Sequence, residues 1–468
     1  MSLTKVSYSL IKGEIINVFD YLTDAEITAV QTNTYTTVTD VTAALNSAFA
    51  NINKVVFIPN GTYKITSNLD VPQCSQIIGE STYATTIVAA SGVTTVLEFN
   101  NTTYGVHITR LANFNIVGNA TASAVGLYFG KDNIVSNLLV ENVTVTAFTG
   151  SAAIACYCKN VLLTTFINCY FNTSNIGLLI QASDTSSSLP TTLSFIGGGA
   201  RQNNVNGVKI VTGRQIIFQN FDFESNVEEG LYVVPAAASV LSNITFSDCW
   251  FEGNYPTPVA YEVLLDGSNI PAACSVYIIR PWFNNTVSGA KSIRVVGSII
   301  FSFQDVRPNI DLTFPISIEG TTCIGEISLD RLTEGGYYST YVSDVNSRAH
   351  NLKPFAKNDT TVVGTNVTNT GTATFKMTYC RNGSVVTGSI RIVSSTGNTS
   401  ATANSTYFDV PSEFPVTYTG NCVGATAAAA SLGVGIVTTG TNRIYVPSWA
   451  TQTDVTITFS YYTSWLGN

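Results

Sequence analysis

Two nine-residue stretches decide the fold: Phe218-Gln-Asn-Phe-Asp-Phe-Glu-Ser-Asn226 and Phe246-Ser-Asp-Cys-Trp-Phe-Glu-Gly-Asn254. They match at two phenylalanines, the glutamate and the final asparagine, with a shift of 28 residues. Phe166–Asn172, Ile278–Asn284 and, more weakly, Leu111–Ile116 and Val140–Val145 fit the same frame. One apolar position then recurs at intervals of 29, 26, 29, 23, 28 and 32 residues, at Ile116, Val145, Phe171, Ala200, Phe223, Phe251 and Phe283.

A repeat of this length predicts a right-handed parallel β-helix. Three short strands and three turns need about as many residues as one repeat supplies, and stacked coils let every strand pair above and below. Asparagine tolerates the left-handed conformation and bonds neighbouring backbone groups. The asparagines that precede the apolar column therefore indicate a ladder of turns, at Asn113, Asn142, Asn168 and Asn220.

The remaining chain predicts a cap before the β-helix and a sandwich after it. Residues 1–69 form an N-terminal cap with one helix, VTAALNSAFA, for which Thr39 or Asp40 can serve as the N-cap residue. Residues 70–342 form the β-helix, and the polar stretch 343–358, which contains Pro354, is a linker. Residues 359–468 alternate as antiparallel strands and predict a C-terminal β-sandwich that serves trimerisation, sugar binding or both.

Composition excludes several classes of partner. The chain has 468 residues, of which 45% are hydrophobic and only 11% charged, and its net charge is −8. Because it has no basic run, we expect no nucleic-acid partner, and without a long apolar stretch we expect no membrane insertion. The nine cysteines are not spaced as in metal sites, and the sequence shows no export signal. We therefore expect free thiols, folding in a reducing cytoplasm, and no metal or other cofactor.

Four N-terminal segments stand out: Asn17-Val-Phe-Asp-Tyr21, Asp40–Leu45, Val55-Val-Phe-Ile-Pro-Asn-Gly-Thr-Tyr63 and Ile65–Leu69. In these segments the chain resembles bacteriophage tailspikes of the pectate-lyase-like β-helix superfamily. The resemblance implies a homotrimer on a phage tail or baseplate, folded in the host bacterial cytoplasm and attached to host surface polysaccharide. Asp20-Tyr-Leu-Thr-Asp24 departs from the commoner opening of the family, and no calcium or arginine motif for pectin chemistry aligns.

The alternation of inward and outward side chains along the repeated strand predicts a groove on the outer face. If Phe223 and Phe251 point inward, their neighbours point outward, which gathers acids, an arginine and aromatic rings on one face. Aromatic faces stack on sugar C–H surfaces, and paired acids can protonate a leaving oxygen and activate water. We therefore predict the catalytic residues Glu224, Glu252 and Asp222, and the substrate-binding residues Trp250, Trp282, Tyr170, Arg201 and Asp248.

The pairing of the acids stays open at this point. Glu224 and Glu252 on adjacent coils suit a retaining glycosidase, whereas Asp222 with Glu224, or Asp222 with Glu252, suits an inverting one. The same acids can instead bond turn amides, and the tryptophans can instead lie at a trimer interface.

The leading hypothesis is a phage tailspike that depolymerises a capsular, O-antigen or other exopolysaccharide by hydrolysis. The alternatives are a lyase on a uronic-acid polymer, which needs a Tyr, His or Lys base beside an arginine, and a tail adhesin that binds without cleaving.

Overall fold

The fold is taken from a computed structural model, which divides the chain into two compact units. Unit 1 comprises Met1–Gly325 with Ser339–Ser343, and unit 2 comprises Glu326–Tyr338 with Asp344–Asn468. The structure describes residues 15–463 apart from 33–39, 52, 72–75, 100–107, 183–188, 237–239, 255–260, 270–273, 285–290, 307–315, 320–322, 330–341, 345–348, 352–354, 370, 383–384, 412–415 and 429.

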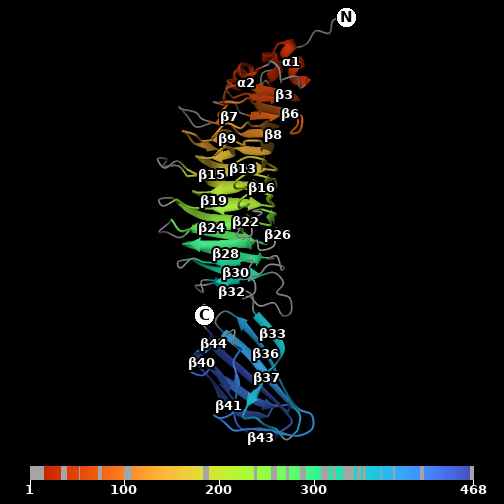
Figure 1. Cartoon of the computed structure of the whole chain (residues 1–468), viewed down its shortest axis with the longest axis vertical. Coiled ribbons are helices and arrows are strands. Elements are labelled where there is room, and N and C mark those ends of the chain that lie inside the picture. Colours follow the sequence, from red (N-terminus) through yellow and green to blue (C-terminus); the bar gives the residue numbers. More distant parts are fainter. Residues whose placement is uncertain are drawn as a thin grey trace. The chain divides into compact units, whose positions relative to one another are not determined.

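Unit 1 begins with short helices that cap the β-helix (Figure 1). The predicted helix is present as α2 (Thr42–Phe49), but its N-cap residue is Val41 and not Asp40, and Thr39 lies outside the described residues. The Asp40 carboxylate accepts a hydrogen bond from the Thr42 backbone N–H at 3.0 Å. Sequence reasoning missed α1 (Asp24–Gln31), although a capping box marks its start: Thr23 and Glu26 bond each other's backbone N–H. A 3₁₀ turn, η2 (Val18–Tyr21), precedes both helices.

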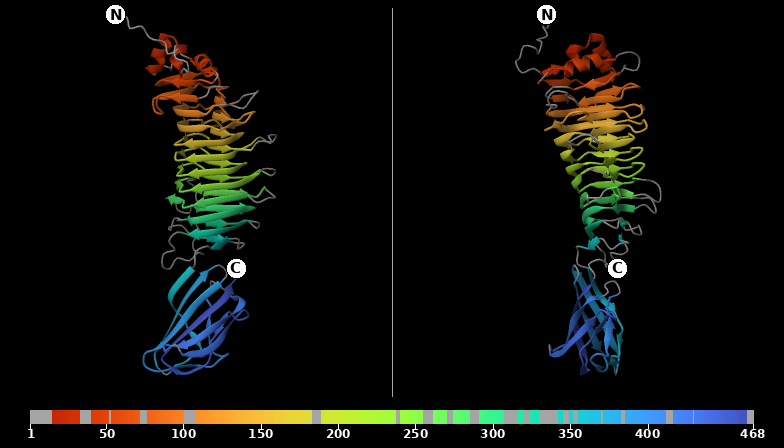
Figure 2. Two further views of the ribbon diagram at one scale, coloured as in Figure 1. Left: turned by 180° about the vertical axis from the view of Figure 1, so that it is seen from behind. Right: turned by 90° about the vertical axis from the view of Figure 1, so that its left-hand side faces the viewer.

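Three columns of parallel strands form the β-helix, which confirms the predicted architecture (Figures 1 and 2). The first column contains β1 (Ile15–Asn17), β2 (Val55–Ile58), β5 (Gln76–Gly79), the starts of β8 (Arg110–Val117) and β11 (Leu139–Thr146), β10 (Val135–Ser136), β13 (Val161–Ile167), β16 (Thr191–Ile196), β19 (Gly213–Gln219), β22 (Leu241–Ser247), β25 (Cys274–Ile279) and β28 (Ile299–Val306).

The second column carries the repeated sequence. It contains β3 (Gly61–Ile65), β6 (Thr85–Ala89), the ends of β8 and β11, β14 (Tyr170–Asn172), β17 (Gly199–Arg201), β20 (Asp222–Glu224), β23 (Trp250–Glu252) and β26 (Trp282–Asn284). The third column contains β4 (Leu69–Asp70), β7 (Thr95–Phe99), β9 (Val125–Phe129), β12 (Ile154–Cys158), β15 (Ile176–Ile180), β18 (Val208–Ile210), β21 (Leu231–Val233), β24 (Tyr261–Gly267), β27 (Lys291–Gly297) and β29 (Ile316–Ile318).

The register of the second column is the one that the repeat predicts. Val145 pairs with Ile116 and Phe171, and Phe223 pairs with Ala200 and Phe251. These side chains are buried inside the coils, where the rings of Phe223 and Phe251 stack at 4.5 Å between centroids. A second internal ladder stacks Phe166, Phe195, Phe218 and Phe246. Burial of these rings fixes which neighbours face outward.

Turn ladders hold the corners between columns. The predicted asparagines between the first and second columns, from Asn113 to Asn220, have positive φ angles of 51° to 61°. A buried ladder follows the second column, where the Asn203 amide donates to Asn226 Oδ1 at 2.8 Å and the Asn226 amide donates to Asn254 Oδ1 at 2.6 Å. The buried Glu262 carboxylate accepts from Asn254 and ends that ladder.

Unit 2 is built on antiparallel strands, as predicted. Its larger sheet runs in the order β33 (Phe355–Thr361), β36 (Ala373–Asn382), β37 (Val385–Ser394), β44 (Asp454–Thr463), β40 (Val416–Thr426), β41 (Ser431–Thr438), β42 (Arg443–Tyr445), β39 (Tyr407–Asp409) and β34 (Gly364–Thr365). A smaller sheet contains β35 (Thr368–Asn369), β38 (Thr399–Ala401) and β43 (Trp449–Gln452). Residues from both sheets share one core, among them Ile390, Phe408, Val437, Trp449 and Ile457.

Strands also occur where the sequence predicts a linker. β31 (Val342–Asp344) overlaps the start of the predicted linker and β32 (Ala349–Asn351) lies within it, whereas β30 (Ile324–Leu329) lies in the predicted β-helix range; all three are in the stretch where the two units alternate along the chain. The boundaries 70–342, 343–358 and 359–468 stay predictions. Among the described residues, neither helix has the length and hydropathy that a membrane span requires. The seven cysteines whose side chains are described are buried free thiols.

Candidate functional site

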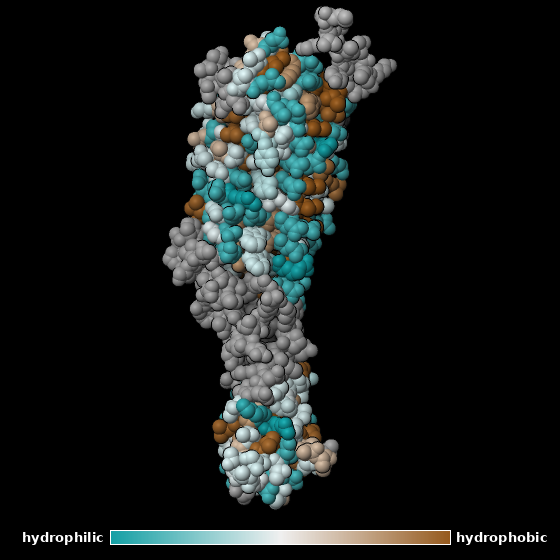
Figure 3. Space-filling model, turned by 90° about the vertical axis from the view of Figure 1, so that its right-hand side faces the viewer, coloured by the Kyte–Doolittle hydropathy of each residue, from teal (hydrophilic) through white to brown (hydrophobic). Residues whose placement is uncertain are grey.

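The outward face of the second column gathers the predicted site residues. Asp222 pairs in register with Trp250, which pairs with Trp282 on the next coil. Two residues further along each strand, Glu224 pairs with Arg201 and Glu252. All of these side chains are at least partly exposed, while the intervening phenylalanines are buried, so the predicted alternation is confirmed. Figure 3 shows hydrophilic side chains over much of one side of the β-helix.

Arg201 joins two of the predicted acids. Its Nη2 lies 2.5 Å from Asp222 Oδ2, and its Nε lies 3.3 Å from Glu224 Oε2. The guanidinium also lies over the Tyr170 ring, 5.3 Å from the centroid. Gly199 makes room for this arrangement, because a Cβ at that position would lie 2.8 Å from the Asp222 backbone oxygen and 3.5 Å from Arg201 Nε. The structure therefore brings Tyr170, Arg201, Asp222 and Glu224 together.

Of the two acids that Arg201 contacts, Asp222 is the more buried. Its side chain is largely buried, and Oδ1 has no hydrogen-bond partner among the described residues. Burial raises the pKa of the Asp222 carboxyl, with Glu224 and Glu252 adding repulsion and Arg201 opposing the change. A carboxyl that keeps its proton to higher pH can serve as a proton donor.

Glu252 has a different set of partners. Its Oε2 accepts a hydrogen bond from the Trp250 indole N–H at 2.8 Å, and its Oε1 accepts one from the Asn284 amide at 2.7 Å. The Trp250 and Trp282 rings stack at 5.4 Å with an interplanar angle of 12°, and the two residues are 39% and 43% exposed. Glu252 thus holds Trp250 in place and, with it, an exposed aromatic surface.

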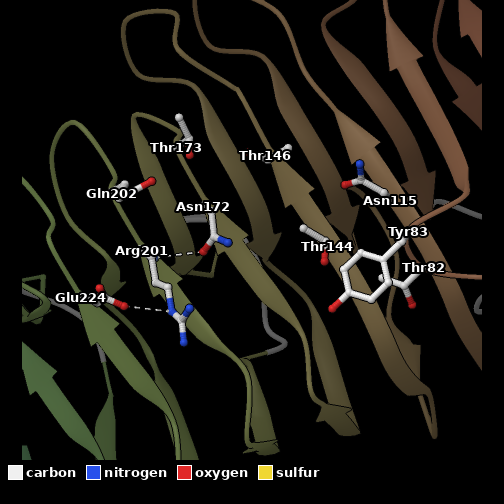
Figure 4. A pocket seen from close by; sticks show the side chains of 10 residues that line it. All are labelled: Thr82, Tyr83, Asn115, Thr144, Thr146, Asn172, Thr173, Arg201, Gln202 and Glu224. Atoms are coloured by element: carbon white, nitrogen blue, oxygen red, sulfur yellow. Dashed lines mark hydrogen bonds and ion pairs between the residues drawn. The ribbon is translucent and has the colours of Figure 1, made fainter.

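A pocket of about 360 Å³ extends from Glu224 toward the N-terminal coils (Figure 4). Arg201 and Glu224 lie at one end, and Thr82 and Tyr83, from the turn between β5 and β6, lie at the other (Figure 4). Strand and turn side chains line the space between them: Asn115, Thr144, Thr146, Asn172, Thr173 and Gln202. Sequence reasoning missed Tyr83, because this residue lies in a turn outside the repeat. The only signal in the sequence is the polar character of the preceding residues in Glu80–Ala84, which indicates an exposed turn.

Asp248, a predicted binding residue, belongs to the turn ladder. Asp248 and Arg280 occupy the ladder position of the asparagines, with φ angles of 55° and 47°. Arg280 Nε and Nη2 donate to the two Asp248 oxygens at 2.7 and 2.8 Å, and Ser247 Oγ donates to Oδ2. The hydrogen bonds from Arg280 and then Ser247 lower the pKa of Asp248. These contacts give Asp248 a structural role in the turn.

The arrangement is suited to proton transfer beside a bound chain. Asp222 and Glu224 are two residues apart on one strand, so their side chains lie on the same face, about 6.7 Å apart along the backbone. The described residues include no group of three or more His, Cys, Asp or Glu side chains that could hold a metal ion.

A family model described as "Rhamnogalacturonase A/epimerase, pectate lyase-like" matches residues 33–253. The match makes this part of the chain similar to a pectate-lyase-like domain. The matched range includes the pocket, Arg201, Asp222 and Glu224, and ends one residue after Glu252. No curated protein matches the chain.

Solved structures to which the chain shows some similarity include phage proteins and enzymes. ORF18 of Geobacillus virus E2 is 15% identical with a TM-score of 0.45, over 95% of this chain and 78% of that one. The tailspike protein gp49 from Pseudomonas phage LKA1 is 11% identical with a TM-score of 0.41, over 95% and 99%. The GH87 alpha-1,3-glucanase from Streptomyces thermodiastaticus is 14% identical with a TM-score of 0.41, over 68% and 63%.

Proposed function

We propose that this protein is a phage tailspike that binds a bacterial surface polysaccharide along the second column and hydrolyses it. The observation that carries the proposal is the continuous arrangement of a pocket, an acid pair bridged by Arg201, and an exposed tryptophan stack on one face of consecutive coils. The pectate-lyase-like domain supports action on a glycan. The tailspike assignment, with its homotrimer and its place on the virion, rests on the resemblance of the N-terminal segment.

Asp222 and Glu224 are our preferred catalytic pair. Asp222 acts as the general acid, because burial favours its protonated form. Glu224, which lines the pocket, activates water as the general base. The two residues are about 6.7 Å apart along the backbone of one strand, and this spacing is compatible with an inverting pair. Arg201 positions both acids.

Glu252 is less suited to the chemical step than the sequence suggests, because both of its oxygens already accept hydrogen bonds. We assign it the positioning of Trp250. A retaining mechanism through Glu224 and Glu252 would require Glu252 to give up one of these bonds.

Binding without cleavage is the second candidate function. This function is favoured because each of the three acids already has a partner within the protein. Arg201 contacts Asp222 and Glu224. Glu252 accepts hydrogen bonds from Trp250 and Asn284. Elimination is less well supported, because Arg201 is already paired with two carboxylates and so is not available to neutralise a uronate.

The test is mass spectrometry of capsular and O-antigen polysaccharides after incubation with wild type, Asp222→Asn, Glu224→Gln and Glu252→Gln. We expect fragments that each carry an added water, a loss of at least about 100-fold in rate for Asp222→Asn and Glu224→Gln, and a smaller loss for Glu252→Gln. Unsaturated fragments would establish a lyase. Intact polymer that the wild type binds tightly would establish an adhesin.

A further inference from the structure

The pocket on the N-terminal side of Arg201 has an uncharged lining. Eight of its ten lining residues are four threonines, two asparagines, one glutamine and one tyrosine: Thr82, Thr144, Thr146, Thr173, Asn115, Asn172, Gln202 and Tyr83. The other two, Arg201 and Glu224, are opposite in charge and lie 3.3 Å apart. The lining therefore has no net charge and is rich in hydroxyl and amide groups.

Arg201 is not available to a negatively charged sugar. It contacts Asp222 as well as Glu224, so the guanidinium is already engaged by two acidic side chains. Glu252 adds a third acidic side chain on the next coil. An anionic ligand at this end of the pocket would meet net negative charge and would have to displace an ion pair.

Tyr83 supplies a flat apolar surface at the other end. It is 95% exposed and lines the pocket at the end opposite Arg201 and Glu224 (Figure 4). The turn is attached to the coils, because the hydroxyl of the adjacent Thr82 donates to the Asn142 backbone oxygen at 2.7 Å. An aromatic side chain presented to solvent by an anchored turn is suited to stacking against the C–H face of a sugar ring.

Asn115 supplies an acceptor without a donor. Its Oδ1 is buried and has no hydrogen-bond partner among the described residues. Leaving a buried acceptor unpaired costs free energy, which a donor on a ligand would restore. A sugar hydroxyl is such a donor, and it needs no charge.

We propose that this pocket is a subsite for an uncharged sugar residue, with Tyr83 as its stacking surface and Asn115 as a hydroxyl acceptor. The assignment rests on the proposed function and specifies its substrate: a glycan whose unit in this pocket has no uronate, phosphate or sulfate. Tyr83 and Asn115 are binding residues, distinct from the acids that carry the chemical step.

The test measures binding of the full-length protein to a panel of bacterial polysaccharides of known repeat, each acidic member being accompanied by its carboxyl-reduced form. The variants are Tyr83→Ala, Tyr83→Phe and Asn115→Ala. For the bound polymer we expect at least about tenfold weaker binding with Tyr83→Ala, less than about twofold change with Tyr83→Phe, and about fivefold weaker binding with Asn115→Ala.

We expect this Tyr83-dependent ligand to be a neutral or carboxyl-reduced polymer, with a dissociation constant that changes less than about twofold on raising the salt concentration. Tyr83-dependent binding to an acidic polymer that is lost on carboxyl reduction would overturn the inference. So would a bound polymer whose affinity is unchanged in Tyr83→Ala. Neutral binding that depends on Tyr83, without cleavage, would support the subsite while refuting hydrolysis.

Discussion

At the scale of single residues, the same acid type serves different purposes within two adjacent coils. Asp222 is largely buried, and one of its carboxylate oxygens has no hydrogen-bond partner among the described residues. Asp248 lies in a turn and accepts hydrogen bonds from two nitrogens of Arg280. Their pKa values move in opposite directions for these reasons. Sequence alone ranks them by position in the repeat, which cannot show burial or partners.

The opposite shifts predict opposite pH dependences. The raised pKa of Asp222 means that its contribution to the free energy of unfolding is present below 3.8 and is lost as pH rises through the folded-state pKa. Asp222→Asn does not titrate, so its melting temperature relative to wild type should rise between about pH 3 and about pH 7. Thermal unfolding at the two pH values checks this, and a relative melting temperature that falls would contradict it.

Asp248→Asn is the matched control with the other sign. The lowered pKa of Asp248 stabilises the fold above 3.8, and this contribution is lost as pH falls through the folded-state value. The relative melting temperature of Asp248→Asn should therefore fall between about pH 3 and about pH 7. Because the pair is partly exposed and asparagine accepts the left-handed turn, we expect less than about 1 kcal/mol of destabilisation and unchanged polysaccharide binding. Weakened binding would support the predicted role of Asp248 as a substrate-binding residue.

At the scale of elements, the apolar repeat makes the fold predictable. The spacing of Phe223 and Phe251 is sufficient to assign register and outward face, and the structure agrees. Residues outside the repeat could not be placed this way: the Tyr83 turn, helix α1 and the bonds made by Glu252 depend on contacts between segments. The predicted groove residues are gathered on one face, but their roles depend on partners that no pattern encodes.

The buried asparagine ladder predicts a large loss of stability on truncation. Asn226→Ala removes an amide that donates to Asn254 Oδ1 and to the Ala200 backbone oxygen, and an acceptor for Asn203. Each buried group left unpaired costs about 1–3 kcal/mol, so we expect a loss of at least about 3 kcal/mol in chemical denaturation. Asn204→Ala, an exposed neighbour of Asn203, should cost less than about 0.5 kcal/mol. Similar losses for both variants would contradict the ladder's importance.

At the scale of the whole molecule, each unit has its own buried core. The core of unit 2 contains residues of its two antiparallel sheets, from Met377 to Tyr461. We therefore predict that a fragment of residues 326–468 unfolds cooperatively on heating and shows β-sheet circular dichroism. A fragment that unfolds gradually and binds a hydrophobic dye would show that this unit requires the rest of the chain.

The number of coils stacked in register in the second column also sets the length of its outward face. From Asn115 to Trp282 the outward face crosses seven coils, or about 29 Å at the usual strand spacing. Insertion or deletion of one complete coil would change this length by one strand spacing. The side chains of the remaining coils would keep their inward or outward direction. Evolution can therefore adjust how long a chain the face accommodates without redesigning the residues that contact it.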